Sequence, residues 1–263
     1  MKLQVDRLSV GYGSKIVSHD LSLAVEAGQV VVLLGPNGCG KTTLLKTLLG
    51  LLKPLSGKVM LDEHDVREMS VQERARHMAY VPQSMAMTFG FDVRQTVTMG
   101  RVAHRPWWQA PGVADTQVVE ACLARFRLQN LADQPVHLIS GGQRQLTLLA
   151  RAMAQEANFV FLDEPTASLD FGNQGHVLGE MQRMAQKGLG VLFTTHDPNH
   201  AVRYADHAVL MSEQGILTQG PAGEVIGANT LSQLYGCEID ASNSLGGYPV
   251  FITRDQYSIS IRA

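Results

Sequence analysis

The sequence lacks any apolar run long enough to cross a membrane. Its longest apolar stretches, residues 30–34 and 159–162, are far shorter than the roughly 20 residues that a spanning helix needs. Residues 1–6 alternate between apolar and polar side chains and lack the cationic start and apolar stretch of a signal peptide. We therefore expect a cytoplasmic protein that reaches a membrane only through a partner.

Cysteine is scarce, and neither sign of charge is in large excess. Cys39, Cys122 and Cys237 are widely spaced and form no C-x-x-C pair, which argues against a disulfide framework or a structural zinc site. The formal net charge is -2, from 22 basic and 24 acidic residues. No basic field is therefore available to attract nucleic acid, and we expect no nucleic-acid partner.

The pattern of short apolar runs predicts an α/β fold. Residues 2–10 and 21–25 alternate like half-buried antiparallel strands, and residues 29–34 then form a continuous apolar run. Further apolar runs at 158–162 and 190–194 are separated by helical patterns, as in a parallel sheet covered on both faces. Length and composition (263 residues, 45% hydrophobic) suit one domain with an inserted lobe.

That inserted lobe is predicted to be helical and to span about residues 92–155. Its best helix candidates are 115–126 and 141–154. The adjacent Trp107 and Trp108 lie in a predicted loop and are expected to pack the lobe, with docking at an interface as the alternative. After residue 228 the chain continues as a C-terminal extension (residues 228–263) with β-like runs at 249–253 and 257–262 and no predicted chemistry.

One motif predicts a phosphate-binding loop. Residues 35–42 match G-x-x-x-x-G-K-[ST] and lie between the buried strand 29–34 and an apolar helix predicted at 43–49. Backbone N–H groups of such a loop face inward, Lys41 reaches the terminal phosphates and the Thr42 hydroxyl can hold Mg²⁺. The predicted nucleotide-binding residues are Gly35, Pro36, Asn37, Gly38, Cys39, Gly40, Lys41, Thr42 and Thr43.

Two acidic residues follow a second buried strand. Ligands of open α/β sheets bind beyond the carboxyl ends of the strands, where Asp163 and Glu164 are expected. We expect Asp163 to coordinate Mg²⁺ and Glu164 to polarise the water that attacks the terminal phosphate. An acidic pair alone is more often a solvated turn or a helix cap, but the phosphate loop favours the catalytic interpretation.

A second potential anion site begins the helix at 141–154. Ser140 and Gln143 have capping-box spacing, which offers a purely structural explanation. Capping does not require two glycines, however, and the amides of Gly141 and Gly142 could bind an anion at the helix N-terminus. Since the chain already has a phosphate loop, this second site could serve another molecule.

Together these motifs resemble the nucleotide-binding subunits of ABC transporters, over roughly residues 1–225. Six motifs of that family occur in order: phosphate loop, glutamine loop, signature, Walker B, D-loop and switch histidine. Here they are residues 35–42, Gln83, residues 139–143, residues 160–164, residues 168–170 and His196. The signature departs at its first position, where Ile139 replaces the usual leucine. The resemblance implies a RecA-like P-loop fold in which residues 1–227 form the nucleotide-binding domain.

The resemblance also implies roles for residues that the motif chemistry leaves open. Gln83 would contact Mg²⁺ and the attacking water, and the segment after it would meet a transmembrane subunit. His196 would face the γ-phosphate, and Tyr12 would stack on adenine. Ser140, Gly141, Gly142, Gln143 and Asp170 would contact ATP bound to a second copy of the chain.

The implied assembly is an ATP-sandwich homodimer on two transmembrane permease subunits, at the cytoplasmic face of the inner membrane. A secreted or periplasmic substrate-binding protein would act indirectly. Residues 91–101 and 194–199 look like importers of iron-siderophores, haem and cobalamin, with molybdate or another oxyanion as the alternative cargo. A soluble ABC ATPase of DNA repair or translation is disfavoured because the chain carries one compact cassette with no coiled-coil insertion.

Overall fold

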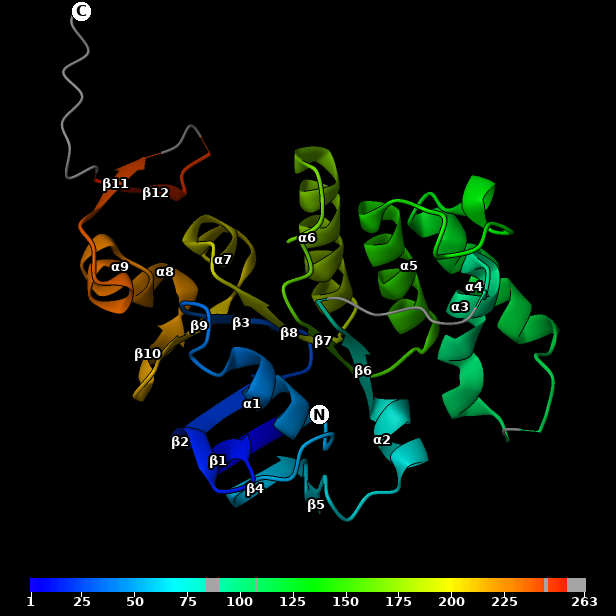
Figure 1. Cartoon of the computed structure of the whole chain (residues 1–263), viewed down its shortest axis with the longest axis horizontal. Helices are drawn as coiled ribbons and strands as arrows, with labels where there is room; N and C mark the ends of the chain where they lie inside the picture. The colour runs from blue at the N-terminus through cyan, green and yellow to red at the C-terminus, as the bar shows by residue number, and fades with distance from the viewer. Residues whose placement is uncertain (84–89, 107, 244–245, 255–263) are drawn as a thin grey trace, which may run out of the picture.

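The computed structural model describes residues 1–83, 90–106, 108–243 and 246–254, arranged as two main β-sheets with helices around them and a two-stranded hairpin near the C-terminus (Figure 1). Residues after Gln83 that were expected to meet a transmembrane subunit, together with Trp107 and the β-like run at 257–262, lie outside this description. No helix among the described residues combines the length and the apolar character needed to cross a membrane.

The N-terminal sheet is antiparallel, as the alternating sequence predicts. Its strand order is β2-β1-β4-β5. One face packs on the core through residues such as Leu3, Val5 and Leu23, while the residues between them are largely exposed. The strands are β1 (Lys2–Tyr12), β2 (Lys15–Glu26), β4 (Ser56–Leu61) and β5 (His64–Asp65).

The central sheet has the order β10-β9-β3-β8-β7-β6 and is parallel except for β10, which runs antiparallel to β9. All five residues of β3 are buried because both faces are covered. Val31 and Leu33 pack toward the N-terminal sheet and α1, and Val30 and Val32 pack toward the helices on the other face. The strands are β3 (Val30–Leu34), β6 (Met78–Val81), β7 (Phe159–Leu162), β8 (Gly190–Thr195), β9 (His207–Ser212) and β10 (Gly215–Pro221).

The inserted lobe is helical, and no named strand occurs among its described residues. It lies to the right of the central sheet in Figure 1 and comprises α3 (Val93–Thr98), η1 (Met99–His104), α4 (Val113–Arg125), η2 (Gln129–Leu131) and α5 (Gly141–Ala154). Helix α5 begins and ends where the sequence predicts. The predicted α/β fold, with its antiparallel subdomain and helical insertion, is confirmed.

The remaining helices cover the sheet or continue into the C-terminal extension. They are α1 (Lys41–Leu48), α2 (Val71–His77), α6 (Phe171–Gln186), α7 (Pro198–Tyr204) and α8 (Ala222–Val225). The extension begins with a helix, α9 (Ala228–Tyr235), which its sequence pattern did not suggest, and continues as the hairpin β11 (Ile239–Asn243) and β12 (Pro249–Thr253). Leu231 and Leu234 bury α9 against the main core.

Candidate nucleotide site

The phosphate loop connects β3 to α1 at the carboxyl end of the central sheet. Gly38 and Gly40 have φ angles of +87° and +102°, which lie in the left-handed region where a side chain would be strained. Gly40 is also the N-cap of α1, and no side chain caps that helix. The amides at the start of α1 are therefore left available for an anion.

Lys41 lies folded back on this loop. Its ammonium donates hydrogen bonds to the carbonyls of Gly35 (2.7 Å) and Pro36 (2.9 Å), and the side chain is buried. When a nucleotide binds, its negatively charged phosphate oxygens could replace these two carbonyls as the acceptors for Lys41.

Cys39, predicted to bind nucleotide, has its side chain in the interior. It is 1% exposed and belongs to the core cluster under the N-terminal sheet. Burial raises the pKa of its thiol above the ordinary value. Only the backbone of this residue is thus suited to meet a phosphate.

Asp163 follows β7 and is hydrogen-bonded to hydroxyl groups from two other elements. Its Oδ1 accepts from Thr42 Oγ1 (3.0 Å) at the start of α1 and from Thr194 Oγ1 (2.8 Å) in β8. Tyr80, in the neighbouring strand β6, has a raised pKa because it is buried and lies beside this carboxylate. Asp163 is 3% exposed, so its orientation is fixed by these partners.

Glu164 occupies an unusual backbone conformation. Its φ angle is +46°, in the left-handed region that non-glycine residues rarely adopt. The backbone N–H donates to Thr194 Oγ1 (2.9 Å), which helps to hold this turn. The strained turn aims the carboxylate at Gln83 and His196: Gln83 Nε2 lies 3.4 Å from Oε2, and His196 Nδ1 lies 3.2 Å from Oε1.

The phosphate loop, the start of α1, Gln83 and Glu164 line one cavity of about 450 Å³, whereas Asp163 and His196 are not part of its lining and join the site through their contacts with Thr42 and Glu164. Through the cavity and these hydrogen bonds, four segments far apart in the sequence meet: the end of β3 with α1, Gln83 two residues after β6, the turn after β7 and the turn after β8. Besides Val17, the cavity lining contains the predicted residues Asn37, Gly38, Gly40, Lys41, Thr42, Thr43, Gln83 and Glu164. Tyr12, the predicted adenine partner, is half-exposed at the end of β1 and does not line this cavity.

The signature residues lie apart from this cavity at the exposed start of α5. Ser140 and Gln143 form the predicted capping box, with bonds of 3.2 Å (Gln143 N to Ser140 Oγ) and 2.9 Å (Ser140 N to Gln143 Oε1). A Cβ at Gly141 would meet nothing within 4 Å, so packing in this chain does not require glycine there. Gly142 lies against Ser168 and Leu169.

Asp170 also has a structural role within its own chain. It is the N-cap of α6, and its carboxylate accepts from the backbone (2.8 Å) and side-chain amide (2.9 Å) of Asn173. Like Ser140, it is exposed.

Thr194 is the site residue that the sequence reasoning missed. It is fully buried, donates to Asp163 and accepts from the N–H of Glu164, so it orients both acidic residues. A signal was present: Thr194 and Thr195 end an otherwise apolar strand that lies beside the strand bearing the acids. Polar side chains at the carboxyl end of a central strand belong to the ligand side of such a sheet.

A glycine-rich loop between a buried strand and a helix, with an acidic pair after a neighbouring parallel strand, defines a P-loop nucleoside triphosphatase. The family model described as "ABC transporter" matches residues 18–167, more than half of the chain. The chain belongs to the ABC transporter family, as an ATP-binding domain that hydrolyses ATP. The family identification made from the motifs is thereby confirmed.

Curated relatives and solved structures agree with this assignment. The chain is 35% identical over 254 residues to the petrobactin import ATP-binding protein FpuD of Bacillus anthracis, covering 95% of this chain and 92% of the relative. It is 37% identical over 239 residues to the hemin import ATP-binding protein HmuV of Rhodococcus jostii, covering 90% and 81%. A chain of an inward-facing metal-chelate type ABC transporter superposes with a TM-score of 0.83 at 32% identity, covering 96% of both chains.

Proposed function

We propose that this chain is the ATP-hydrolysing subunit of an importer of metal chelates, and that Lys41, Asp163, Glu164, Gln83 and His196 are its catalytic machinery. The observation that carries the proposal is the meeting of Gln83 and His196 on the Glu164 carboxylate, beside the phosphate loop. A site for nucleotide binding alone would need the loop but not these three groups around one position for water.

Nucleotide binding is assigned to the loop and the start of α1. The amides of the loop and α1 face the phosphates, and Lys41 exchanges its carbonyl partners for phosphate oxygens. Cys39 contributes its backbone, and Tyr12 is proposed to stack on adenine once ATP is bound.

The donor set beside the loop fits Mg²⁺. Thr42 offers a hydroxyl, Asp163 a carboxylate and Gln83 an amide oxygen, and hard oxygen donors are what Mg²⁺ prefers. Thr42 and Asp163 are already in contact (3.0 Å). Mg²⁺ held by these groups would neutralise charge on the phosphates. Thr194 donates to the same Asp163 oxygen that accepts from Thr42, and it keeps that carboxylate turned toward Thr42.

Hydrolysis is assigned to Glu164, which accepts a proton from water as that water attacks the γ-phosphorus and ADP leaves. The reaction consumes one water and yields ADP and phosphate. His196 and Gln83 hold the carboxylate and the water in position, because both already contact Glu164. The strained backbone at Glu164 fits this role, since such conformations are concentrated at functional sites.

Completion of the site is assigned to a second copy of the chain. Ser140, Gly141 and Asp170 are exposed and Gly142 and Gln143 are partly exposed, and none of the five lines its own chain's cavity. A Cβ at Gly141 would meet nothing within 4 Å, which leaves space there for a ligand. The start of α5 from one copy would therefore cover ATP on the loop of the other.

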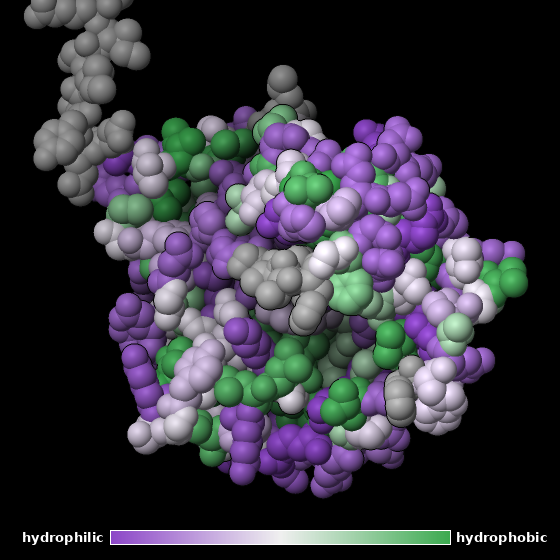
Figure 2. All heavy atoms as spheres, turned by 45° about the vertical axis from the view of Figure 1, so that its right-hand side comes forward, coloured by the Kyte–Doolittle hydropathy of each residue, from purple (hydrophilic) through white to green (hydrophobic). Residues whose placement is uncertain are grey.

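A separate groove suits a transmembrane partner. It lies between α2 and η1, has a volume of about 600 Å³, and is lined by exposed apolar side chains that include Val71, Val102 and Trp108. Figure 2 shows hydrophobic side chains gathered around a hollow on the face that carries the helical lobe. We propose that permease subunits dock here, which would place the chain at the cytoplasmic side of the inner membrane.

The cargo is proposed from the relatives, because an ATPase subunit has no contact with cargo. Relatives at 35% and 37% identity are named for import of petrobactin and hemin. The predicted cargo is accordingly an iron-siderophore, haem or cobalamin, supplied by a substrate-binding protein.

The test is uptake by cells from which this gene is deleted, measured with labelled iron-siderophore, haem, cobalamin and molybdate. Restoring the wild-type chain should restore uptake of one chelate, and restoring Glu164→Gln should not. Recovery of molybdate uptake alone would contradict the chelate assignment. Equal recovery with Glu164→Gln would contradict the catalytic one.

A further inference from the structure

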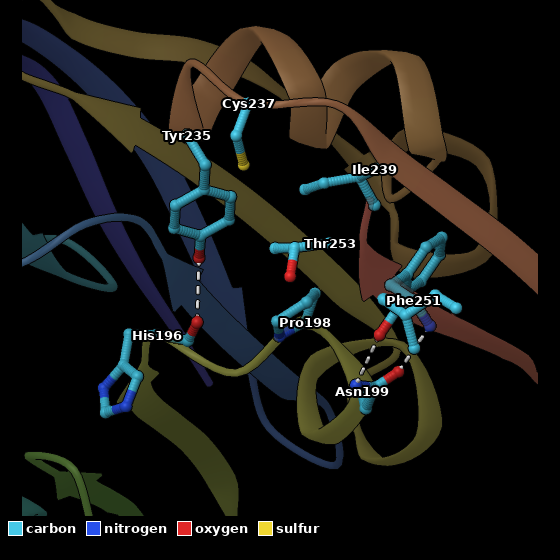
Figure 3. Close-up of a pocket in the computed structure, with 9 residues that line it drawn as sticks. His196, Pro198, Asn199, Tyr235, Cys237, Ile239, Phe251 and Thr253 are labelled. Atoms are coloured by element: carbon cyan, nitrogen blue, oxygen red, sulfur yellow. Dashed lines mark hydrogen bonds between the residues drawn. The ribbon is translucent and has the colours of Figure 1, made fainter. Parts of the chain in front are cut away.

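The residues that carry His196 are attached to the C-terminal extension at two points. The Tyr235 hydroxyl, at the end of α9, donates a hydrogen bond of 2.9 Å to the backbone carbonyl of His196 (Figure 3). Asn199, at the start of α7, donates to the carbonyl of Phe251 (3.2 Å) and accepts from its N–H (2.8 Å). The extension is therefore hydrogen-bonded to the segment 196–199 at two places, from α9 and from β12.

The two parts of the extension that make these hydrogen bonds are themselves anchored in the core. Leu231 and Leu234 bury α9 in the main core, and Phe251 is 6% exposed and joins the same core. Between the two attachments lies a cavity of about 630 Å³, which includes His196 and Tyr235 in its lining. The side of the segment 196–199 that faces this cavity is not closely packed. On that side, the two sets of hydrogen bonds to the extension restrain the segment.

Tyr235 is suited to remain a donor at any physiological pH. Burial raises the pKa of its hydroxyl, and the nearby carboxylate of Asp197 raises it further. The hydroxyl stays protonated, and its partner is a carbonyl that can only accept.

The imidazole of His196, by contrast, is half-exposed and is held by Glu164 alone among the described contacts of its ring. Its direction therefore depends on how its backbone is held. Before His196 the backbone is held by β8. After His196, the hydrogen bond from Tyr235 fixes the peptide group that leads into α7.

We propose that Tyr235 is a positioning residue for ATP hydrolysis, through which the C-terminal extension sets the direction of His196. The proposal rests on the function assigned to His196 above. The extension thereby acts on the rate of the chemical step and not on ATP affinity, since neither Tyr235 nor Phe251 lines the nucleotide cavity. Disturbing the extension, for example by filling the cavity, would slow hydrolysis.

The test is steady-state ATP hydrolysis by Tyr235→Phe, which removes one hydroxyl and little else. A net hydrogen bond of the usual strength corresponds to a fall in kcat of about two- to tenfold, with KM for ATP within about twofold. The matched control is Ser232→Ala, which removes a hydroxyl from the same helix; among the described contacts, that hydroxyl accepts from Ile239 N–H. Its kcat should equal that of the wild type, and thermal unfolding should show both variants folded.

The decisive comparison uses the His196→Ala background, with residual hydrolysis followed over long incubations of labelled ATP. Tyr235→Phe should have no further effect there, because it acts through His196. A wild-type kcat in Tyr235→Phe, or the same fold-loss with and without His196, would overturn the proposal. If Tyr235→Phe fails to fold, Asn199→Ala tests the second attachment with the same expectations. Wild-type hydrolysis by His196→Ala would instead refute the function assigned to His196.

Discussion

At the scale of single residues, side chains that are neighbours in sequence have different environments. Asp163 is buried and bound to two threonine hydroxyls, whereas the adjacent Glu164 turns through a strained φ angle to meet His196. In the proposed mechanism the first carboxylate holds a metal ion and the second accepts a proton from water. The hydroxyl of Thr194 orients both residues, because it donates to the Asp163 carboxylate and accepts from the backbone N–H of Glu164.

Lys41→Ala should lower the affinity for ATP by about 100-fold or more, as measured by equilibrium binding of labelled nucleotide. The estimate follows from losing two charge-assisted hydrogen bonds, each contributing about 1.5–3 kcal/mol. Lys46→Ala, on the same helix but outside the cavity, is the control and should bind like the wild type. Unchanged affinity in a folded Lys41→Ala variant would remove the loop from the mechanism.

At the scale of elements, the helical lobe is tied to α6 by a buried acidic residue. Glu180 of α6 accepts from Arg125 of α4 and from Arg183 on its own helix. Burial opposes ionisation of Glu180, but the hydrogen bonds from the two arginines outweigh burial and lower its pKa. This arrangement fixes the lobe that carries α5, and with it Ser140, relative to the central sheet.

Glu180→Gln should destabilise the fold by about 1–3 kcal/mol at pH 7, because Arg125 loses its charged partner. The folded pKa lies below the ordinary value of 4.5, so the contribution is complete above that pH and is lost as the pH falls through the folded pKa. Denaturant unfolding at pH 7 and at about pH 4 should show the difference from wild type shrinking. The exposed Glu63→Gln is the control, and an equal effect there would contradict the assignment.

Ser140→Arg should abolish hydrolysis while leaving ATP binding by the isolated chain nearly unchanged. The variant also loses a helix cap, which costs about 0.5–2 kcal/mol. Ser70→Arg is the matched control, because Ser70 forms the same capping box with Glu73 at the start of α2. Loss of ATP binding in Ser140→Arg, or an equal loss of hydrolysis in Ser70→Arg, would count against completion of the site by a second copy.

How much could be predicted from sequence also depends on scale. The phosphate loop, α5 and its capping box follow from local rules, since glycine conformation and helix capping act over a few residues. The extension was harder, because α9 is short and gains its stability from burying Leu231 and Leu234 against a distant core. Thr194 and Tyr235 were missed for the same reason: their roles arise from partners 31 and 39 residues away.

At the scale of the whole molecule, two faces of the chain are assigned to different partners. We propose that the edge with the phosphate loop and Ser140 meets a second copy, and that the groove between α2 and η1 meets a permease.

Val71→Glu should therefore weaken co-purification with the transmembrane subunit while ATP binding stays unchanged, because it places a charge in an apolar groove. Val113→Glu is the control: both valines are exposed and both are the first residue of a helix, but only Val71 lines the groove. Equal co-purification by the two variants would contradict the assignment.

We propose that ATP joins two copies of this chain and that Glu164 then activates the water that hydrolyses it. Glu164→Gln keeps the size of the side chain and loses its charge, so ATP binding should persist while hydrolysis falls by about 10²–10⁴-fold. With turnover blocked, each ATP would bridge Lys41 of one copy and Ser140 of the other. The most direct measurement is the molar mass of this variant in solution with ATP and Mg²⁺. We expect a dimer, and we expect the additional substitution Ser140→Arg in the same chain to abolish it. A monomer that hydrolyses ATP at the wild-type rate would refute both the role of Glu164 and the shared site.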